Sequence, residues 1–377
     1  MPTIIRRAFS TYPFYERWRY SRKINQLKKE YPAAFKTKLS PELEREITSY
    51  WRSFGVKVNL DWHRGYIGIC GGENVHRYIP EDIYYAYIER ALSRLELADA
   101  YGDKNEYDRI FPGVRGPITL IRSINGRFYD REYRYLTRKR AEDTIVGFEG
   151  DLIVKPSLDS GDGKNVRKLT VAKGKLSFGN ESTNFDELVK NYGLDYLVQF
   201  VFQQHPSMAE FHPSSVNTIR FYTLRFDDEI KIISAVFRSG NMGRCFDNRG
   251  IPCGIRHDGS LNDHAATKYF TKFESHPVTG KKFKGFVIPG WKDACEFVKL
   301  LHQNLRYFES VSWDVTINPE SEPCLMEINL NFQEINFHQV NNGPLYGDLT
   351  DEVLSRVFQR ISPKPFCRFS NRRTSEK

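Results

Sequence analysis

The sequence predicts an α+β protein in which a helical N-terminal region precedes two α+β lobes. Helical periodicity dominates the first hundred residues, whereas short apolar runs alternate with turn residues from about residue 118 onward. The chain has 377 residues, of which 40% are hydrophobic and 14% aromatic, so it is long enough for two or three domains with a sizeable core. We predict that residues 1–100 form a helical region, residues 101–195 the first lobe and residues 196–362 the second lobe. Residues 363–377 are predicted to form a basic tail.

Two helices define the N-terminal region. Ser40 is expected to cap a helix that begins with Pro41, and Gly55 is placed to end it. A long helix is predicted from Pro80 to Tyr101, because apolar residues recur along one side and Gly102 follows as a stop signal.

The first lobe is expected to begin with a strand at residues 118–121. Its further predicted elements are strands at 151–156 and 166–171 and a helix from Phe185 to Tyr192 capped by Asn184. The two lobes are expected to join at residues 195–202.

The second lobe is predicted to open with an antiparallel hairpin. Residues 215–226 and 230–239 alternate around the turn residues Asp227 and Asp228. Residues 240–291 look loop-rich, and because loops longer than about 12 to 15 residues are usually functional or disordered, we expect them to face a substrate. A helix from Lys292 to Phe308 follows.

Two strands near the C-terminus carry oxygen side chains at their ends. A strand at 313–317 contains Asp314, and one at 324–329 ends in Glu327, Ile328 and Asn329. Period-2 alternation places both oxygen side chains of the second strand on one face, with Ile328 turned to the core. Mg²⁺ prefers hard oxygen ligands and usually binds through one or two carboxylates plus substrate phosphates. The pattern predicts a magnesium site, although turn-forming or solvated side chains would give the same letters.

A second candidate site lies upstream, where an apolar strand ends in Lys155. The polar turn of residues 157–166 follows, and its Ser160, Gly161 and Gly163 would let backbone N–H groups approach an anion closely. The turn matches neither GxxxxGK[ST] nor GxGxxG. An ordinary hairpin turn is the alternative, because residues 166–171 alternate like a strand.

A strand-end lysine, a glycine-containing loop and a later D…ExN set, in this order, resemble the ATP-grasp superfamily. The resemblance is greater to its sugar-transfer-associated branch, found with polysaccharide biosynthesis, and covers roughly residues 78 to 355. Further matching stretches are Asp103-Lys104-Asn105, Asn217-Thr218-Ile219-Arg220, Phe246-Asp247-Asn248 and His276-Pro277-Val278-Thr279-Gly280. The resemblance implies an ATP-grasp fold, in which two α+β lobes clasp ATP between antiparallel sheets. His276 is open to interpretation as a functional or a turn-stabilising residue.

Roles for individual residues follow from this resemblance. Lys104 and Lys155 would hold the ATP phosphates, the 157–166 loop would close over them, and Arg220 with Lys155 would stabilise the transition state. The resemblance further implies that adenine meets the backbone of Gln199, Phe200 and Val201. It implies that Mg²⁺ is bound by Asp314, Glu327 and Asn329. The substrate would be bound by Arg220, Arg238 and Asn248. Two positions depart from the relatives, since Gln199 stands where they often carry Glu and Asn331 where some carry Arg.

The implied reaction is ATP-dependent ligation of a carboxylate to an amine through an acyl phosphate. ATP and Mg²⁺ are the expected cofactors, and the carboxylate and amine substrates are expected to be sugar-linked or amino acids. Two alternatives remain open: a kinase of a glycan or lipid-linked sugar hydroxyl, and a non-catalytic ATP-binding partner of glycosyltransferases.

Composition narrows the remaining partners. The net charge is +9, and basic residues alternate with aromatic ones over residues 6–29, which would suit anionic lipid headgroups or a polyanionic glycan. The favoured interpretation is nevertheless a solvated basic helix that packs Phe14, Trp18 and Ile24 on the body. No nucleic-acid-binding pattern is present. No apolar run reaches the roughly 18 residues of a membrane helix, so a cytoplasmic location is predicted. Peripheral contact with a membrane stays open as an addition to it.

The six cysteines are scattered without CxxC spacing. They are expected to be reduced and structural.

Overall fold

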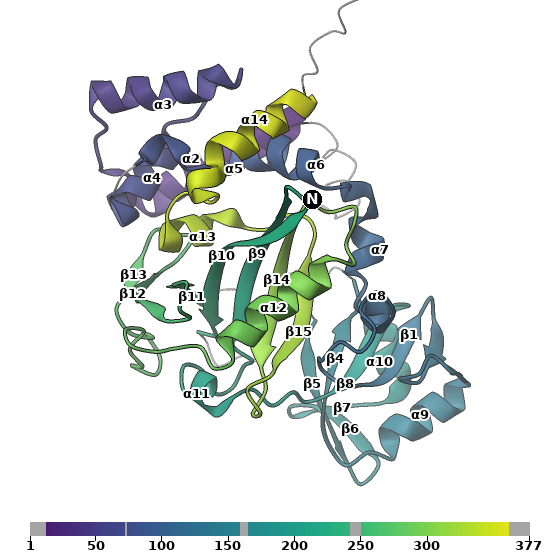
Figure 1. The fold of residues 1–377 in the computed structure, drawn as a ribbon. Helices are drawn as coiled ribbons and strands as arrows, with labels where there is room; N and C mark the ends of the chain where they lie inside the picture. Colours follow the sequence, from purple (N-terminus) through teal and green to yellow (C-terminus); the bar gives the residue numbers. More distant parts are fainter. Residues whose placement is uncertain (1–12, 72–73, 159–164, 242–249, 362–377) are drawn as a thin grey trace, which may run out of the picture.

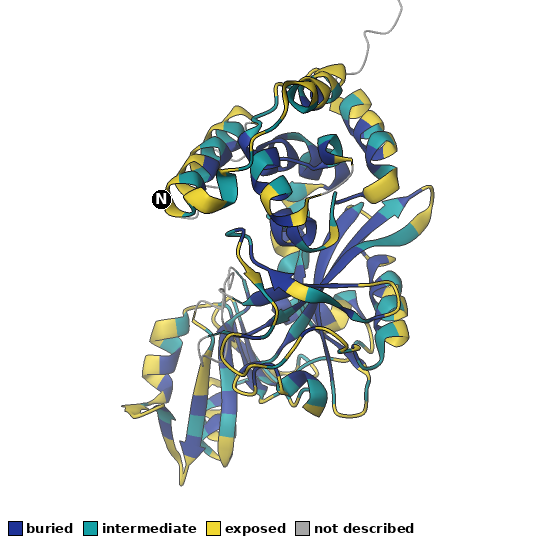
Figure 2. Cartoon of the chain, turned by 90° about the vertical axis from the view of Figure 1, so that its left-hand side faces the viewer, coloured by how far each residue is buried: buried dark blue, intermediate teal, exposed yellow. Residues whose placement is uncertain are grey.

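The computed structural model describes residues 13–71, 74–158, 165–241 and 250–361. N-terminal helices lie across one end of a seven-stranded antiparallel sheet, and an eight-stranded antiparallel sheet forms a separate lobe (Figure 1). Buried positions line the inner faces of both sheets and of the helices that cover them (Figure 2). The predicted α+β class is confirmed.

The N-terminal region begins with helices that agree with their capping signals. They are α2 (Pro13–Glu30), η1 (Pro32–Phe35), α3 (Pro41–Ser53), α4 (Asp61–Cys70) and η2 (Val75–Arg77). Ser40 Oγ accepts a hydrogen bond from the Leu43 N–H over 3.2 Å, and Gly55 follows α3 with φ +76°. The predicted cap and stop of this helix are therefore confirmed.

The first helix of the described chain packs differently from the prediction. Ile24 is fully buried, but Phe14 is 69% exposed and Trp18 is 53% exposed. The expectation that all three pack on the body was therefore wrong for the two aromatic residues.

The single helix predicted from Pro80 to Tyr101 was also wrong. The segment consists of α5 (Glu81–Ile83), the π-helix η3 (Tyr84–Ile88), α6 (Glu89–Leu92), η4 (Leu95–Leu97), α7 (Ala98–Gly102), η5 (Lys104–Glu106) and α8 (Tyr107–Ile110). Ser93 is extended and forms a β-bridge with Phe308, and the Glu309 N–H donates to the Leu92 carbonyl over 2.7 Å. Pairing with a segment more than 200 residues away thus interrupts a locally helical pattern.

The first sheet has the strand order β3-β2-β1-β8-β4-β5-β6-β7. Its strands are β1 (Thr119–Ile124), β2 (Arg127–Tyr129), β3 (Tyr135–Leu136), β4 (Gly150–Pro156), β5 (Arg167–Ala172), β6 (Lys175–Phe178), β7 (Glu181–Thr183) and β8 (Tyr196–Phe200). Its helices are α9 (Arg138–Val146) and α10 (Phe185–Tyr192), the second capped by Asn184 as predicted. Because β8 lies in the middle of this sheet, the predicted boundary between residues 195 and 196 has to move beyond Phe200.

The second sheet has the strand order β13-β12-β11-β10-β9-β14-β15. Its strands are β9 (Thr218–Phe226), β10 (Glu229–Ser239), β11 (Ile251–Ile255), β12 (Leu261–Ala266), β13 (Lys272–Phe273), β14 (Ser310–Ile317) and β15 (Pro323–Asn329). The other elements of this half are α11 (Pro206–Ala209), α12 (Trp291–His302), α13 (Ile335–Asn342), η7 (Gly347–Leu349) and α14 (Thr350–Ile361). The hairpin of β9 and β10 turns at Asp227 and Asp228, both with positive φ, as predicted.

Two predictions for this half need correction. Residues 240–291, expected to be loop-rich, contribute the three strands β11, β12 and β13. Pro252 and Gly254 are atypical of strands, so the sequence did not predict β11. A Cβ at Gly254 would lie 2.1 Å from Asn342 Oδ1, so the close packing there requires glycine. Helix α12 ends at His302 instead of Phe308, because His302 Nε2 bonds the Phe308 carbonyl oxygen over 2.9 Å and the chain folds back between them.

The faces of the second sheet have different neighbours. Tyr222 and Leu224 belong to one hydrophobic core with Trp51 and Trp62 of the N-terminal helices. On the opposite face, Trp313 belongs to a core with residues of α12. The N-terminal region therefore shares a core with the second lobe.

Candidate functional site

Three of the predicted site residues form a row across neighbouring strands of the second sheet. Arg220 on β9 is the register partner of Asp314 on β14, and Asp314 is the register partner of Glu327 on β15. Residues that pair across antiparallel strands project from the same face. Asn329 pairs with Ser312, two positions along, and Ile328 between the two oxygen-bearing residues is 5% exposed. The hairpin predicted for Asp314, Glu327 and Asn329 is thus present.

Arg220 and Asp314 form a buried ion pair. Arg220 Nε donates to Asp314 Oδ1 over 2.5 Å and Nη2 to Oδ2 over 2.8 Å, while Arg238 Nη1 lies 3.6 Å from Oδ1. Burial acts to raise the pKa of Asp314, but the two guanidinium groups outweigh it and hold the pKa below its usual value. Asp314 is therefore a carboxylate in this site.

Lys104 joins the two lobes. Its backbone N–H donates to the Ser157 carbonyl at the end of β4 over 3.1 Å, and its Nζ donates to Glu327 Oε1 over 2.8 Å. The side chain is almost fully buried. A cation from the first-lobe side thus contacts the predicted metal-ligand strand of the second lobe.

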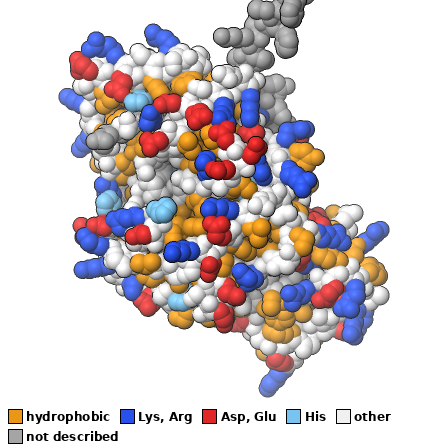
Figure 3. Space-filling model, viewed as in Figure 1, with side chains coloured by type: hydrophobic (Ala, Val, Ile, Leu, Met, Phe, Trp, Pro, Cys, Tyr) orange, Lys and Arg blue, Asp and Glu red, His pale blue; other side chains and the backbone are white. Residues whose placement is uncertain are grey.

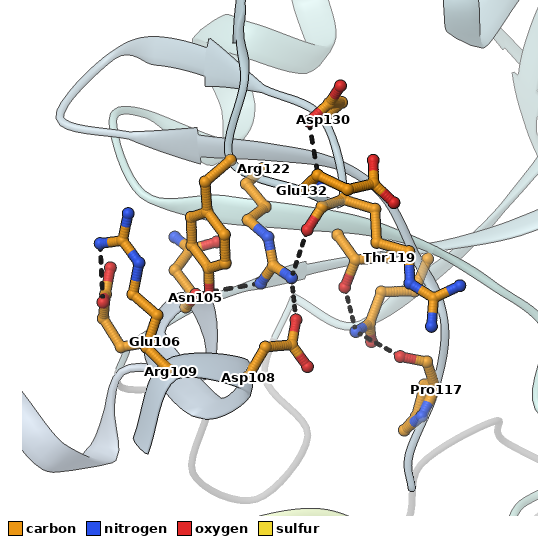
Figure 4. A network of polar contacts seen from close by, with 12 residues as sticks. Asn105, Glu106, Asp108, Arg109, Pro117, Thr119, Arg122, Asp130 and Glu132 are labelled. Atoms are coloured by element: carbon orange, nitrogen blue, oxygen red, sulfur yellow. Dashed lines mark hydrogen bonds and ion pairs between the residues drawn. The ribbon is translucent and has the colours of Figure 1, made fainter. Parts of the chain in front are cut away.

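A polar network fixes the backbone on either side of Lys104. Asp103 caps η5, and Asn105 Nδ2 donates to the Ser123 carbonyl on β1 over 2.9 Å. The buried Arg122 donates from Nη1 to the Asn105 carbonyl over 3.0 Å and pairs with Asp108 (Figure 4). The matching stretch Asp103-Lys104-Asn105 therefore has a structural basis, in which the flanking residues hold the lysine in place.

Lys155 lies on β4, where it pairs with Leu197 of β8. It is 7% exposed. Burial and the nearby charge of Lys104 lower the pKa of Lys155 to about 7, partly opposed by Glu327. A neighbouring polyanion would restore its positive charge.

The predicted metal ligands have a suitable donor set. Two carboxylates and one amide oxygen are hard ligands, and Asn329 Nδ2 is buried without a hydrogen-bond partner among the described residues. Each carboxylate oxygen has two lone pairs, so the bonds from Arg220 leave Asp314 able to coordinate a cation. Within the described chain, no three His, Cys, Asp or Glu side chains gather as a candidate metal site. The donor types therefore suit Mg²⁺, which usually takes one or two protein carboxylates together with substrate phosphates.

Part of the predicted phosphate loop lies outside the described residues, including Ser160, Gly161 and Gly163. Its two ends are described, because β4 and β5 pair in antiparallel register with Val154 opposite Arg167. The loop therefore joins β4 to β5 at the end of the strand that carries Lys155.

The side chain of Gln199 ties two strands of the first sheet together. Its Nε2 donates to Thr119 Oγ1 over 3.0 Å and to the Pro117 carbonyl over 3.3 Å. The amide nitrogen is thus bound to β1 and the segment before it.

The backbone beside Gln199 is only partly available to a nucleotide base. The N–H of Phe200 donates to the Ile118 carbonyl over 2.9 Å, so this donor, predicted to face adenine, is engaged within the protein. Val201 follows directly after β8 and is 38% exposed. Of the predicted adenine contacts, Val201 has the more accessible position.

A cationic and aromatic group borders the Arg220–Asp314 pair. The guanidinium carbons of Arg220 and Arg238 lie 5.7 and 5.5 Å from the centre of the Phe337 ring, within cation–π range. Lys268 Nζ contacts Glu334 Oε1 over 2.6 Å. Burial opposes ionisation of Glu334, but Lys268, Arg238 and Arg220 together lower its pKa to about 2.

Sequence reasoning missed the last members of this group. Glu334 and Phe337 lie five and eight residues after Asn329, beyond the D…ExN pattern, and Lys268 lies in the segment interpreted as a loop. No short-range pattern marks them, because their only shared feature is proximity in the folded chain.

The other matching stretches are mainly structural where they are described. Asn217 Nδ2 donates to three oxygens of the segment before β9, and its Oδ1 accepts from the Gly240 N–H over 3.2 Å. His276 Nε2 bonds the Gly240 carbonyl over 2.6 Å, and the Gly280 N–H closes a turn on the His276 carbonyl. The geometry favours the turn-stabilising interpretation of His276. Asn248, with the rest of Phe246-Asp247-Asn248, lies outside the described residues.

Burial disfavours the thiolate form of three described cysteines. It raises the pKa of Cys253 to about 12 and those of Cys295 and Cys324 to about 11. These thiols are poor nucleophiles near neutral pH.

Within the described segments, every helix is too short or too polar to span a lipid bilayer. Basic and acidic side chains are interspersed over the face shown in Figure 3.

Comparison with protein families gives one match, to the family described as sugar-transfer associated ATP-grasp. It extends over residues 102–353, two thirds of the chain. No curated protein matches the chain by sequence.

Solved structures with a similar fold include three ligases. L-amino acid ligase from Bacillus licheniformis is 10% identical with a TM-score of 0.37, and the alignment covers 71% of this chain and 49% of that protein. D-alanine–D-alanine ligase from Bacillus anthracis is 11% identical with a TM-score of 0.37, covering 69% and 68%. The VanG D-Ala:D-Ser ligase from Enterococcus faecalis is 12% identical with a TM-score of 0.39, covering 69% and 61%. The chain thus spans about half to two thirds of the length of these proteins.

Proposed function

This chain belongs to the sugar-transfer associated ATP-grasp family, and we propose that it is an ATP-dependent carboxylate–amine ligase that modifies a sugar or sugar precursor in polysaccharide biosynthesis. One observation carries the proposal: the row of Arg220, Asp314 and Glu327 meets Lys104 from the other lobe. Cations suited to phosphates and carboxylates suited to a metal thus converge where the two sheets meet.

In the proposed reaction, an oxygen of the substrate carboxylate attacks the γ-phosphorus of ATP. The bond from this phosphorus to the bridging oxygen breaks, giving an acyl phosphate and ADP. The nitrogen of an amine then attacks the acyl carbon, phosphate leaves, and the nitrogen loses a proton as the amide forms.

The chain's own residues mainly bind and position the reactants. Phosphoryl transfer requires alignment and charge neutralisation more than covalent chemistry. Lys104 and Lys155 are proposed to hold the phosphates, with Ser160, Gly161 and Gly163 in the covering loop. Glu327, which bonds Lys104 here, would be free to hold a metal ion if Lys104 engaged a phosphate.

Asp314, Glu327 and Asn329 are the residues proposed to hold Mg²⁺. When bound, Mg²⁺ would neutralise phosphate charge and help to align the γ-phosphate. Arg220, held in place by Asp314, is proposed to stabilise charge on the transferred phosphoryl group and on the acyl phosphate.

Arg238 is proposed to bind the substrate carboxylate. Its side chain is 21% exposed, it lies beside the Arg220–Asp314 pair, and its closest contact to Asp314 is a long 3.6 Å. A guanidinium has five N–H donors in a planar fork that matches a carboxylate. Asn248 is proposed as a second substrate contact, and Gln199, Phe200 and Val201 as the region that meets adenine.

The N-terminal helix supports an additional peripheral contact with an anionic membrane surface. Phe14 and Trp18 are exposed one helical turn apart on α2, and Arg22 lies 4.9 Å from the centre of the Trp18 ring. Exposed aromatic residues next to basic ones suit the headgroup region of a bilayer.

Trapping with hydroxylamine tests the reaction. The protein is incubated with Mg-ATP, hydroxylamine and pools of amino acids and uronic acids, and hydroxamates, ADP and phosphate are measured. A hydroxamate would demonstrate the acyl phosphate and name the carboxylate. ADP with phosphate retained on a sugar would favour the kinase alternative, and no ADP with any pool would favour a non-catalytic partner of glycosyltransferases.

A further inference from the structure

The connection between the predicted metal strand and the next helix has an unusual backbone. Residues 330–334 join β15 to α13, and within them Phe332 and Glu334 have φ values of 52° and 54°. Residues other than glycine rarely adopt this left-handed conformation, which persists only where the surroundings impose it. Surrounding groups must therefore hold this connection in place.

Two buried side chains of the N-terminal region hold it. Glu89 Oε1 accepts a hydrogen bond from the Gln333 N–H over 3.2 Å, and the hydroxyl oxygen of Tyr85 accepts one from the Glu334 N–H over 2.9 Å. Both acceptors are about 2% exposed. Two successive backbone N–H groups are thus satisfied from one helix surface.

The π-helix places these two acceptors together. Tyr85 lies within η3 and Glu89 begins α6, four residues later. A π-turn is wider than an α-turn and is often found at functional sites. The Tyr85 ring stacks on Tyr20 of α2 with centroids 4.4 Å apart, which restricts its hydroxyl to one direction.

The other side of the connection is held by the sheet. Gln333 Nε2 donates to the Ser310 carbonyl over 3.3 Å, and its Oε1 accepts from Ser312 Oγ over 3.0 Å. Ser312 is also the register partner of Asn329. The connection is therefore fixed between the N-terminal helices and the strand that carries Asp314.

We propose that Tyr85 and Glu89 are positioning residues of the active site: by holding residues 330–334 they orient the side chain of Asn329, a proposed Mg²⁺ ligand, and that of Glu334, which pairs with Lys268. This inference rests on the proposed function. It assigns a role in the site to helices that precede residue 102, where the family match begins.

The contacts on each side of the connection explain why the site depends on it. Asn329 is the last residue of β15, and its Nδ2 is buried without a hydrogen-bond partner among the described residues, so no hydrogen bond within them fixes that end of the amide. Glu334 is the residue before α13, and its position also sets that of Phe337, which lies one turn later beneath Arg220 and Arg238.

Binding of the non-hydrolysable analogue AMP-PNP tests this inference. Its affinity is measured by calorimetry in EDTA and in excess Mg²⁺ for the full chain and for Tyr85→Phe, Glu89→Leu and Glu89→Gln. Tyr85→Phe keeps the stacked ring and removes the acceptor, whereas Gln at position 89 retains an acceptor oxygen. Tyr87→Phe is the matched control, since it removes a hydroxyl from the same π-helix.

In Tyr85→Phe and Glu89→Leu, we expect the factor by which Mg²⁺ increases AMP-PNP affinity to be about tenfold smaller than in the unsubstituted protein. Affinity in EDTA should be unchanged. Glu89→Gln and Tyr87→Phe should keep the gain. A full gain in Tyr85→Phe and Glu89→Leu would overturn the inference, even with lowered melting temperatures. Equal losses with and without Mg²⁺ would also overturn it, because the two residues would then support the fold in general. Absence of AMP-PNP binding in the unsubstituted protein would instead overturn the proposed function and the inference with it.

Discussion

The guanidinium of Arg220 and the carboxylate of Asp314 form a buried pair with two hydrogen bonds, across the neighbouring strands β9 and β14. A predicted phosphate-binding cation and a predicted metal ligand are therefore mutually compensated before any nucleotide binds. Removing either partner leaves an uncompensated buried charge, which is costly.

Asp314→Asn is expected to abolish turnover and also to destabilise the protein. The free energy of unfolding should fall by about 3 kcal/mol, because Arg220 would remain charged and buried. Urea denaturation of Asp314→Asn, Arg220→Met and the double variant measures the coupling. The double variant should be less destabilised than the sum of the two single variants. Strict additivity would show that the pair does not compensate the two charges.

Glu327→Gln is expected to abolish turnover while leaving the fold stable. The Glu327 side chain is 29% exposed, against 9% for Asp314, and it accepts one hydrogen bond from Lys104, whereas Asp314 accepts two from Arg220, so its replacement removes a more solvated and less extensive ion pair. Unfolding midpoints and Mg²⁺-dependent ADP release are the measurements. Normal turnover in this variant would contradict the metal assignment.

Nucleotide binding is expected to take up a proton through Lys155. The pKa of Lys155 is about 7 in the free protein, below its ordinary value, and polyphosphate would raise it again. Uptake should therefore be small at pH 6, where the lysine is already protonated, and approach one proton at pH 8. Affinity should weaken as the pH rises above 7, at most about tenfold per pH unit.

Calorimetry of ADP binding in buffers of different ionisation enthalpy measures this uptake. Lys155→Met provides the control, because it retains the titration of the nucleotide and of all other groups. Identical proton uptake by both proteins would exclude Lys155 as the group that titrates.

Trp18→Ala and Phe14→Ala are expected to weaken sedimentation with vesicles rich in phosphatidylserine. These substitutions remove exposed aromatic surface and leave the buried Ile24 of the same helix in place. Val278→Ala is a suitable control, because it removes a 60% exposed apolar side chain elsewhere. Unchanged sedimentation of the α2 variants, or equal binding to neutral vesicles, would argue against a lipid-facing helix.

Local sequence signals predicted many elements of the fold. Ser40 and Asn184 cap their helices, Asp227 and Asp228 turn the hairpin of β9 and β10, and Ile328 is buried between two outward-facing residues. Each of these outcomes depends on interactions between residues close together in the sequence, so the sequence alone is enough to predict them.

Elements that depend on distant partners were predicted poorly. The helical pattern of residues 80–101 breaks at Ser93, because that residue pairs with Phe308. Strand β11 was missed because Pro252 and Gly254 are atypical of strands, although packing against Asn342 requires the glycine.

The sequence by itself determined the family and the order along the chain of the residues proposed to form the site. Lys155 at a strand end and Asp314, Glu327 and Asn329 on a hairpin are visible in the order of the chain. Only the tertiary structure decided which of these groups meet. Arg220 and Asp314 are 94 residues apart and Lys104 and Glu327 are 223 apart, so sheet register and lobe packing bring them together. The same holds for Tyr85 and Glu89, whose hydrogen bonds to residues 333 and 334 follow from the packing of the N-terminal helices against the second lobe.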